Sequence, residues 1–310
     1  MCNRSRRGFL VGSAAAGLLA ARPGWLLAQA SAKPADMTIA RWSGAPLAAD
    51  AGMKDVAVKL TEQAIEALGG MKRFVSRGAV VWVKPNIGWD RTPETAANTN
   101  PDVVATIIRL CFEAGAKTVK VGDNPCDVAE KTYEASGIAA AARQLGAKVV
   151  FLDRTRFKEA KIGGEQIQTI PVYPEIVDAD LVINCPIVKH HRLAGLTMCM
   201  KNYMGVIEKR NTFHQDIATC VTDLTRFMQP RICLLDAVRV LKDHGPSGGD
   251  PKDVELKLTL AAGTDIVALD AWGTELLGKS LADNLAIAKG VEFGLGRSDY
   301  RAIAKEIAVS

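Results

Sequence analysis

The chain has 310 residues, of which 48% are hydrophobic and 24% charged, and its formal net charge is +5. This length suits one large domain, or a domain with a sizeable insertion. Residues 1–30 contain four arginines and no acidic residue, so the net charge of residues 31–310 is only +1. Because nucleic-acid binding needs a basic surface, we expect no nucleic-acid partner.

The first thirty residues have the pattern of an export signal. Arg6 and Arg7 precede a weakly apolar run of alanine, glycine and leucine, as in a twin-arginine signal. The run is interrupted at Arg22 and is shorter than the ~20 residues of a membrane-spanning helix. Small residues favour cleavage after Ala30. We predict a signal peptide over residues 1–30, recognition by the twin-arginine export machinery, and a periplasmic or otherwise exported location. A retained anchor is the alternative.

Strands and helices alternate through residues 31–310, which we predict to form a single domain. The predicted strands are 37–41, 79–84, 118–122, 148–152, 181–188 and 231–235. The predicted helices between them are 53–68, 102–114 and 128–145. This alternation is typical of a parallel sheet flanked by helices.

Two segments depart from this alternation. Residues 162–172 read as a small hairpin around Gly163 and Gly164, placed to cover a crevice at the sheet edge. From residue 238 onward we expect a turn-rich loop, a strand at 256–261, a helix ending at Leu277 and a last helix at 300–307. The predicted fold is therefore α/β: a mostly parallel sheet flanked by helices, with a small hairpin insertion and a C-terminal α+β segment.

Polar side chains follow several of the predicted strands. They are Lys84, Asn86, Asp123, Lys189, His190, His191 and Asp236. The carboxyl ends of parallel strands meet at one edge of a sheet, where open α/β sheets bind ligands. Because ammonium groups and helix N-termini favour negative charge, we predict a crevice that binds an anionic small molecule, either substrate or cofactor. Taken singly, Lys84 and Lys189 could equally be solvated strand ends.

The histidines are candidates for proton transfer. Neighbouring strand residues point to opposite faces, so only one of His190 and His191 is expected to enter the crevice. A neutral imidazole there could act as an acid or base. Their spacing is not that of a helical zinc pair, so the identity of any metal or cofactor stays open. His214, near the start of a predicted helix, is either a third catalytic candidate or a capping or solvent-facing residue.

A methionine-rich segment follows the histidines. Met198, Met200 and Met204 could ligate a soft metal, but their spacing favours packing in a core. Lys201 and Asn202 stand out against these apolar neighbours, since a buried ammonium or amide needs a partner. We therefore predict that Lys201 and Asn202 bind the anion.

Several common site types lack their motifs. The chain contains no phosphate-binding G-x-x-x-x-G-K-[ST] loop, no G-x-S-x-G elbow and no H-E-x-x-H pair. None of its cysteines forms a C-x-x-C pair, and several lie in apolar runs, where cysteine is usually buried and reduced. The spacing of Cys185, Cys199 and Cys220 is not that of a known cluster-binding motif, so we do not expect them to ligate an iron–sulfur cluster.

Together these motifs resemble the family called domain of unknown function 362. The resemblance covers nearly all of residues 31–310 and rests on Val83-Lys84-Pro85-Asn86, Gly122-Asp123, residues 184–189, Lys201-Asn202 with Gly205, His214 with Asp216 and Asp223, Leu235-Asp236, Gly245-Pro246 with Gly248, and residues 262–265 with Asp270. It implies an α/β core. Some relatives carry iron–sulfur ferredoxin modules, which implies a link to redox chemistry and to a redox partner protein; this chain has no ferredoxin-type cysteine run.

Two classes of function remain. One is an exported enzyme, redox-linked through the family resemblance, that holds an anionic substrate or cofactor. The other is a non-catalytic periplasmic binding or accessory protein that uses the same crevice.

Overall fold

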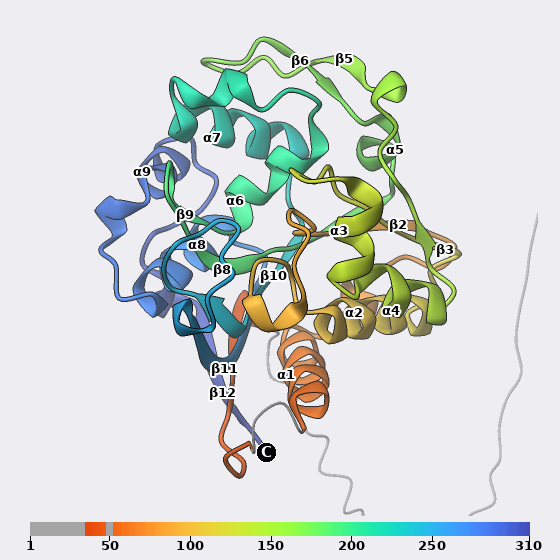
Figure 1. Cartoon of the computed structure of the whole chain (residues 1–310), viewed down its shortest axis with the longest axis vertical. Helices are drawn as coiled ribbons and strands as arrows, with labels where there is room; N and C mark the ends of the chain where they lie inside the picture. The colour runs from red at the N-terminus through yellow and green to blue at the C-terminus, as the bar shows by residue number, and fades with distance from the viewer. Residues whose placement is uncertain (1–34, 48–51) are drawn as a thin grey trace, which may run out of the picture. The chain divides into compact units, whose positions relative to one another are not determined.

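A computed structural model describes residues 35–47 and 52–310 (Figure 1). The expected signal peptide, residues 1–30, lies outside these residues. In the described part of the chain, no helix has both the length and the apolar character needed to cross a membrane.

A large mixed sheet forms the centre of the fold. Its strand order is β12-β1-β11-β10-β7-β2-β3-β4, and β8 and β9 extend it beside β10. The strands are β1 (Met37–Trp42), β2 (Val80–Pro85), β3 (Thr118–Val121), β4 (Lys148–Val149), β7 (Leu181–Cys185), β8 (Ile187–His191), β9 (Gly195–Thr197), β10 (Ile232–Leu241), β11 (Val254–Gly263) and β12 (Ala304–Val309). Only β11 and β9 run antiparallel to their described neighbours. The predicted mostly parallel α/β sheet is confirmed.

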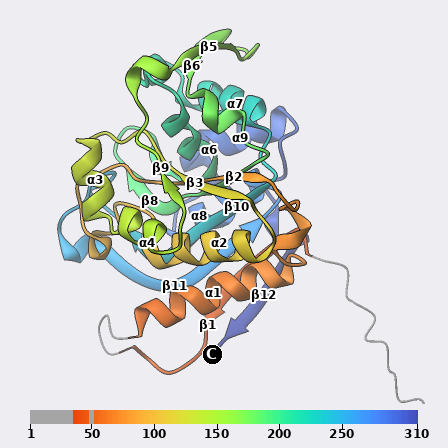
Figure 2. The same cartoon turned by 90° about the vertical axis from the view of Figure 1, so that its right-hand side faces the viewer.

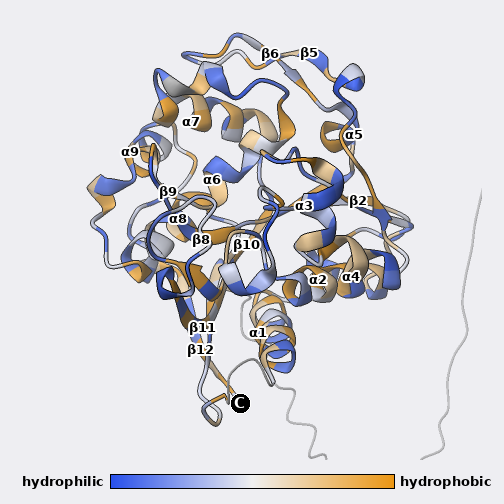
Figure 3. Cartoon of the chain, in the orientation of Figure 1, coloured by the Kyte–Doolittle hydropathy of each residue, from blue (hydrophilic) through white to orange (hydrophobic). Residues whose placement is uncertain are grey.

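Helices cover both faces of the sheet. The helices are α1 (Met53–Ala67), α2 (Pro101–Glu113), α3 (Ala129–Ala135), α4 (Ile138–Gln144), α5 (Pro174–Val177), α6 (Cys199–Asn202), α7 (Ile217–Met228), α8 (Ile266–Leu276) and α9 (Leu285–Glu292). Successive residues of β2 point to opposite faces: Val81 and Val83 pack with α1, α2 and α4, whereas Trp82 joins the core under α6 to α9. Figure 2 shows these two layers on either side of the strands. Hydrophobic residues concentrate where helices and strands meet (Figure 3).

The predicted strand 181–188 is interrupted at Pro186. Proline has no N–H to donate to a neighbouring strand, and its carbonyl oxygen instead accepts a hydrogen bond from Asp236 N at 2.9 Å. The chain resumes as β8, which includes Lys189, His190 and His191. These three residues therefore lie within a strand, not after one.

The sheet also corrects the predicted ends of other elements. β10 continues to Leu241, so Asp236 lies in the interior of a strand. The predicted helix 128–145 divides at Gly137, whose φ of 71° is left-handed and ends the first helix. The helix predicted at 300–307 is wrong. Its residues form a short 3-10 turn, Tyr300–Ala302, and then β12, whose backbone bonds to β1 in parallel and so overrides the weak local helical pattern.

A hairpin is present, formed by the antiparallel strands β5 (Lys158–Lys161) and β6 (Thr169–Val172). It begins before the predicted range 162–172, and Gly163 and Gly164 lie in its connecting loop. The Asp223 carboxylate accepts hydrogen bonds from the backbone N–H groups of Glu165, Gln166 and Ile167 in the connecting loop. This contact holds the loop against α7. None of the described hairpin residues lines the polar cavity that lies at the strand ends, so the hairpin does not cover it.

Candidate functional site

A polar cavity of about 70 Å³ lies beyond the carboxyl ends of β2 and β3, beside β8. Its lining combines cationic, amide and imidazole groups. The predicted site residues in this lining are Asn86, Asp123, Lys189, His191, Lys201 and Asn202. Lys84 is not part of the lining but contacts two of its residues, Asp123 and Asn202. His190 and Asp236 are not part of it.

Lys84 is fully buried and paired. Its Nζ lies 2.7 Å from Asp123 Oδ1 and donates to the Pro85 carbonyl oxygen at 2.9 Å and to Asn202 Oδ1 at 3.2 Å. Burial lowers the pKa of Lys84, and the Asp123 carboxylate opposes that shift. An ammonium group has three protons to donate. Contrary to expectation, Lys84 therefore has no free donor for a ligand and acts as the structural partner of Asp123.

The Lys84–Asp123 pair fits against one glycine. Asp123 also accepts hydrogen bonds from Ile87 N at 2.8 Å and Asn124 N at 2.9 Å, so both its oxygens are satisfied. A Cβ added at Gly205 would stand 1.7 Å from Asp123 Oδ1 and 2.6 Å from Lys84 Nζ. The close approach of the chain at position 205 thus requires glycine.

Two buried asparagines connect the strand ends to α6. Asn202 donates from Nδ2 to the Lys84 carbonyl oxygen at 3.2 Å and to Asn184 Oδ1 at 2.8 Å, while its Oδ1 accepts from Asn86 Nδ2 at 3.2 Å. Asn184 donates in turn to the Cys199 carbonyl oxygen at 2.8 Å. Asn202 therefore fixes the position of Lys201, its chain neighbour. Asn184 was not among the predicted site residues. Its position as a polar amide within an apolar strand could have identified it.

Lys189 is also buried and fully paired. Its Nζ donates to Asn86 Oδ1 at 2.9 Å and to the carbonyl oxygens of Ala97 at 2.5 Å and Pro246 at 3.2 Å. Burial, helped by the nearby Lys201 charge, lowers the pKa of Lys189 to about 7. Lys189 contributes positive charge to the cavity, but its protons are donated to Asn86, Ala97 and Pro246 and are not free for a ligand.

Lys201 differs from both of these lysines. Within the described part of the chain, neither a hydrogen bond nor an ion pair reaches its Nζ. Burial lowers the pKa of Lys201 to about 8, and the Arg210 charge contributes to the shift. Lys201 is half-buried, and an ammonium that has lost part of its hydration without gaining a counter-charge is unfavourable. A bound anion would remove that cost.

Arg210 supplies a second cation that the sequence did not reveal. Its guanidinium donates to Cys126 Sγ at 2.9 Å and to the carbonyl oxygens of Met204 and Pro125 at 3.3 Å each. No carboxylate among the described residues is paired with Arg210. Arg210 lies in a loop several residues after the Lys201-Asn202 and Gly205 motif, and no sequence pattern links it to that motif.

Of the two adjacent histidines, His191 lines the cavity. Its Nδ1 accepts hydrogen bonds from Leu193 N and Ala194 N, both at 3.2 Å. Burial and the Lys201 charge lower the pKa of His191 to about 3. The ring is thus neutral with its proton on Nε2, so His191 can donate a hydrogen bond to an anion. His190 Nδ1 accepts from Gly245 N at 3.0 Å instead. His214 ends a 3-10 turn, Asn211–His214, and its side chain lies outside what the structure describes.

Asp236 does not line the cavity, and its carboxylate bonds to the backbone instead. Its carboxylate accepts hydrogen bonds from Asn100 N at 2.7 Å and Val238 N at 2.9 Å. Burial raises the pKa of Asp236 to about 6. Asn100 caps α2, so Asp236 anchors that helix to β10. The expectation that Asp236 binds the ligand is corrected accordingly.

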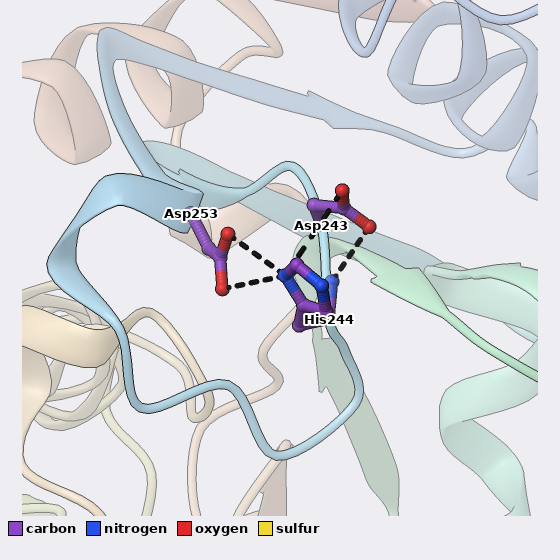
Figure 4. A group of neighbouring side chains, drawn as sticks. All are labelled: Asp243, His244 and Asp253. Carbon is purple, nitrogen blue, oxygen red and sulfur yellow. Dashed lines mark hydrogen bonds and ion pairs between the residues drawn. The ribbon is translucent and has the colours of Figure 1, made fainter.

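Figure 4 shows a separate group formed by Asp243, His244 and Asp253, whose possible ligand atoms lie within 4.8 Å of one another. His244 Nδ1 lies 3.0 Å from both Asp253 oxygens, and this contact raises the pKa of His244. Because Asp243 and His244 are exposed, the group is explained by an ion pair that ties the loop to β11. The described cysteines form no such group: all six are free, and only Cys126 is exposed.

Comparisons with known proteins agree with the motifs. The family model described as "Domain of unknown function (DUF362)" matches residues 81–275, which include the whole lining of the polar cavity. The thylakoid-associated protein sll1697 of Synechocystis sp. (strain ATCC 27184 / PCC 6803 / Kazusa) is 30% identical over 223 residues, 69% of this chain and 67% of that protein. The lactate racemase apoprotein from Thermoanaerobacterium thermosaccharolyticum gives a TM-score of 0.45 at 12% identity, with 77% of this chain and 56% of the racemase chain covered. By the family model and the sequence identity, the chain belongs to the DUF362 family.

Proposed function

We propose that this chain is an exported protein that binds an anionic small molecule in the polar cavity, with Lys201 as its counter-ion. One observation carries the proposal. Lys201 lines the polar cavity and has no hydrogen-bond or ion-pair partner among the described residues, whereas the protons of the neighbouring Lys84 and Lys189 are all donated to protein oxygens. Arg210 and the neutral His191 add further donors to the same lining. Hydrogen bonds from charged donors to an anion are stronger than those between neutral groups.

The test replaces Lys201 by methionine, which keeps the length of the side chain and removes its charge. Charged hydrogen bonds contribute about 1.5–3 kcal/mol, so Lys201→Met should weaken binding of sulfate, phosphate or acetate at least about tenfold. Calorimetric titration measures the change. Lys117→Met is the matched control, because Lys117 is exposed and precedes β3, at the opposite edge of the sheet.

The melting temperature separates this role from a structural one. Without added anion, Lys201→Met should melt at or above the wild-type temperature, since the variant removes an unpaired, partly desolvated charge. Unchanged anion affinity, or a large loss of stability with no anion-induced shift in the wild type, would contradict the proposal.

A second candidate is an enzyme that acts on the same anion. It is favoured by the presence of Lys201 and His191 in one lining, since a lysine with a pKa of about 8 exchanges protons readily near neutral pH. Mass spectrometry of the anion bound after purification, before and after incubation with fresh protein, distinguishes the two. Chemical change supports an enzyme, and unchanged recovery supports a binding or accessory protein.

Export rests on the N-terminal sequence. Arg6→Lys combined with Arg7→Lys should abolish periplasmic accumulation, because the twin-arginine pathway reads the arginine pair and the following apolar run is weak. Cell fractionation and immunoblotting measure the distribution. Undiminished periplasmic protein in the double variant would exclude the twin-arginine route.

A further inference from the structure

Three adjoining cavities share Lys201 in their lining. The first is the polar cavity of about 70 Å³. The second, about 260 Å³, adds the apolar side chains of Leu193 and Ile217. The third, about 480 Å³, keeps Leu193 and Ile217 and extends to Val221 and Leu285. The lining therefore changes from cations to apolar side chains along these cavities. The third cavity is in the size range of small-molecule sites, roughly 300–1,000 Å³.

The apolar end of these cavities is exposed to an unusual degree. Leu285 and Leu193 are 69% and 64% exposed, the highest values among the large hydrophobic side chains of the described residues. Both line the third cavity. Single exposed leucines are ordinary on protein surfaces. Two at the margin of one cavity, which Lys201 also lines, form a surface that an apolar ligand would cover.

Acidic groups in the third cavity are already engaged. Asp216 accepts a hydrogen bond from Thr219 N at 3.0 Å, Asp270 from Cys199 N at 2.7 Å, and Asp283 from Ser280 N at 2.8 Å. Their negative charge disfavours the anionic end of a ligand in the third cavity. Charge and polarity therefore give the ligand a direction, with its negative group beside Lys201 and Arg210 and its apolar part beyond.

We infer that the anion is an aliphatic carboxylate, whose carboxylate pairs with Lys201 and whose hydrocarbon chain lies along Leu193, Ile217 and Leu285. This inference rests on the proposed function and deepens it by naming the ligand class. Its carboxylate would compensate the unpaired ammonium, and its chain would cover the two exposed leucines.

Calorimetric titration of the full chain with butyrate, hexanoate and octanoate tests the inference. Each buried CH₂ contributes about 0.8 kcal/mol, so the Kd should fall about fourfold for each added CH₂. The combined variant Leu193→Ser with Leu285→Ser should weaken octanoate binding far more than butyrate binding, and so lose most of the dependence on chain length. Both leucines are exposed, so the variant leaves the core intact. Leu256→Ser is the control, since Leu256 is 47% exposed and lines none of the three cavities.

The outcomes separate the two proposals. Equal affinity for butyrate and octanoate, with anion binding retained, overturns the amphipathic ligand and leaves the anion site. Chain-length dependence that persists in the double leucine variant overturns the assigned position of the hydrocarbon chain. Failure of the wild type to bind any carboxylate, phosphate or sulfate overturns both.

Discussion

Lys84→Met should lower the free energy of unfolding by about 3–5 kcal/mol, because it leaves the buried Asp123 carboxylate without its counter-charge. Lys84 Nζ is 2.7 Å from Asp123 Oδ1, and both side chains are almost fully inaccessible to solvent. The substitution also removes a hydrogen bond to Asn202, the residue that precedes the 3-10 turn at Tyr203–Val206. Urea unfolding followed by circular dichroism measures the loss.

The second half of this experiment removes the stranded charge. Lys84→Met combined with Asp123→Asn should recover part of the lost stability, because the asparagine oxygen can still accept a hydrogen bond from Ile87 N and no uncompensated charge remains. A single-variant loss below about 1 kcal/mol, typical of a solvent-exposed pair, would show that Lys84 and Asp123 are not buried as a pair.

Sulfate affinity should be constant at low pH and fall as the pH rises through about 8, the pKa of Lys201. Only the ammonium form of Lys201 pairs with an anion, so binding is fully present below this pKa and the Kd rises about tenfold per pH unit above it. Lys189, with a pKa of about 7, adds a smaller and earlier decrease, since its protons are committed to protein oxygens. His191 is neutral throughout, because its pKa is about 3.

Sulfate keeps its charge over this range, so the change reports on the protein. The Lys201→Met variant provides the control and should retain only the small decrease due to Lys189. A steep fall near pH 8 that persists in Lys201→Met would assign the titration to another group. A flat wild-type profile would show that the Lys201 charge takes no part in binding.

The sequence was sufficient to predict the α/β sheet and the approach of some polar residues, among them Asn86, Asp123 and Lys189, to one cavity. Apolar runs identified most of the strands, and parallel order then required their carboxyl ends to meet at one edge. The runs could not show how a strand is divided or extended. Pro186 divides one predicted strand, and β10 continues past Asp236, which depends on pairing with β11.

The roles of the three lysines could not be separated from the sequence. Lys84 and Lys189 carry the same ammonium group as Lys201. Only the folded structure shows that both donate all their ammonium protons to oxygen atoms of the protein. The partners include the backbone oxygens of Ala97 and Pro246, which no side-chain pattern marks. A polar residue after a buried strand can form hydrogen bonds with buried groups of the protein as readily as with a ligand.

Diffraction from a crystal soaked in selenate tests most directly the claim that Lys201 is the counter-ion of a bound anion. Selenium scatters anomalously and marks the anion position without ambiguity. We predict an anomalous peak beside Lys201 that places a selenate oxygen within about 4 Å of its Nζ, the distance limit of an ion pair, and disappearance of the peak in Lys201→Met crystals. A selenate bound elsewhere on the chain, with Lys201 still unpaired, would contradict the account.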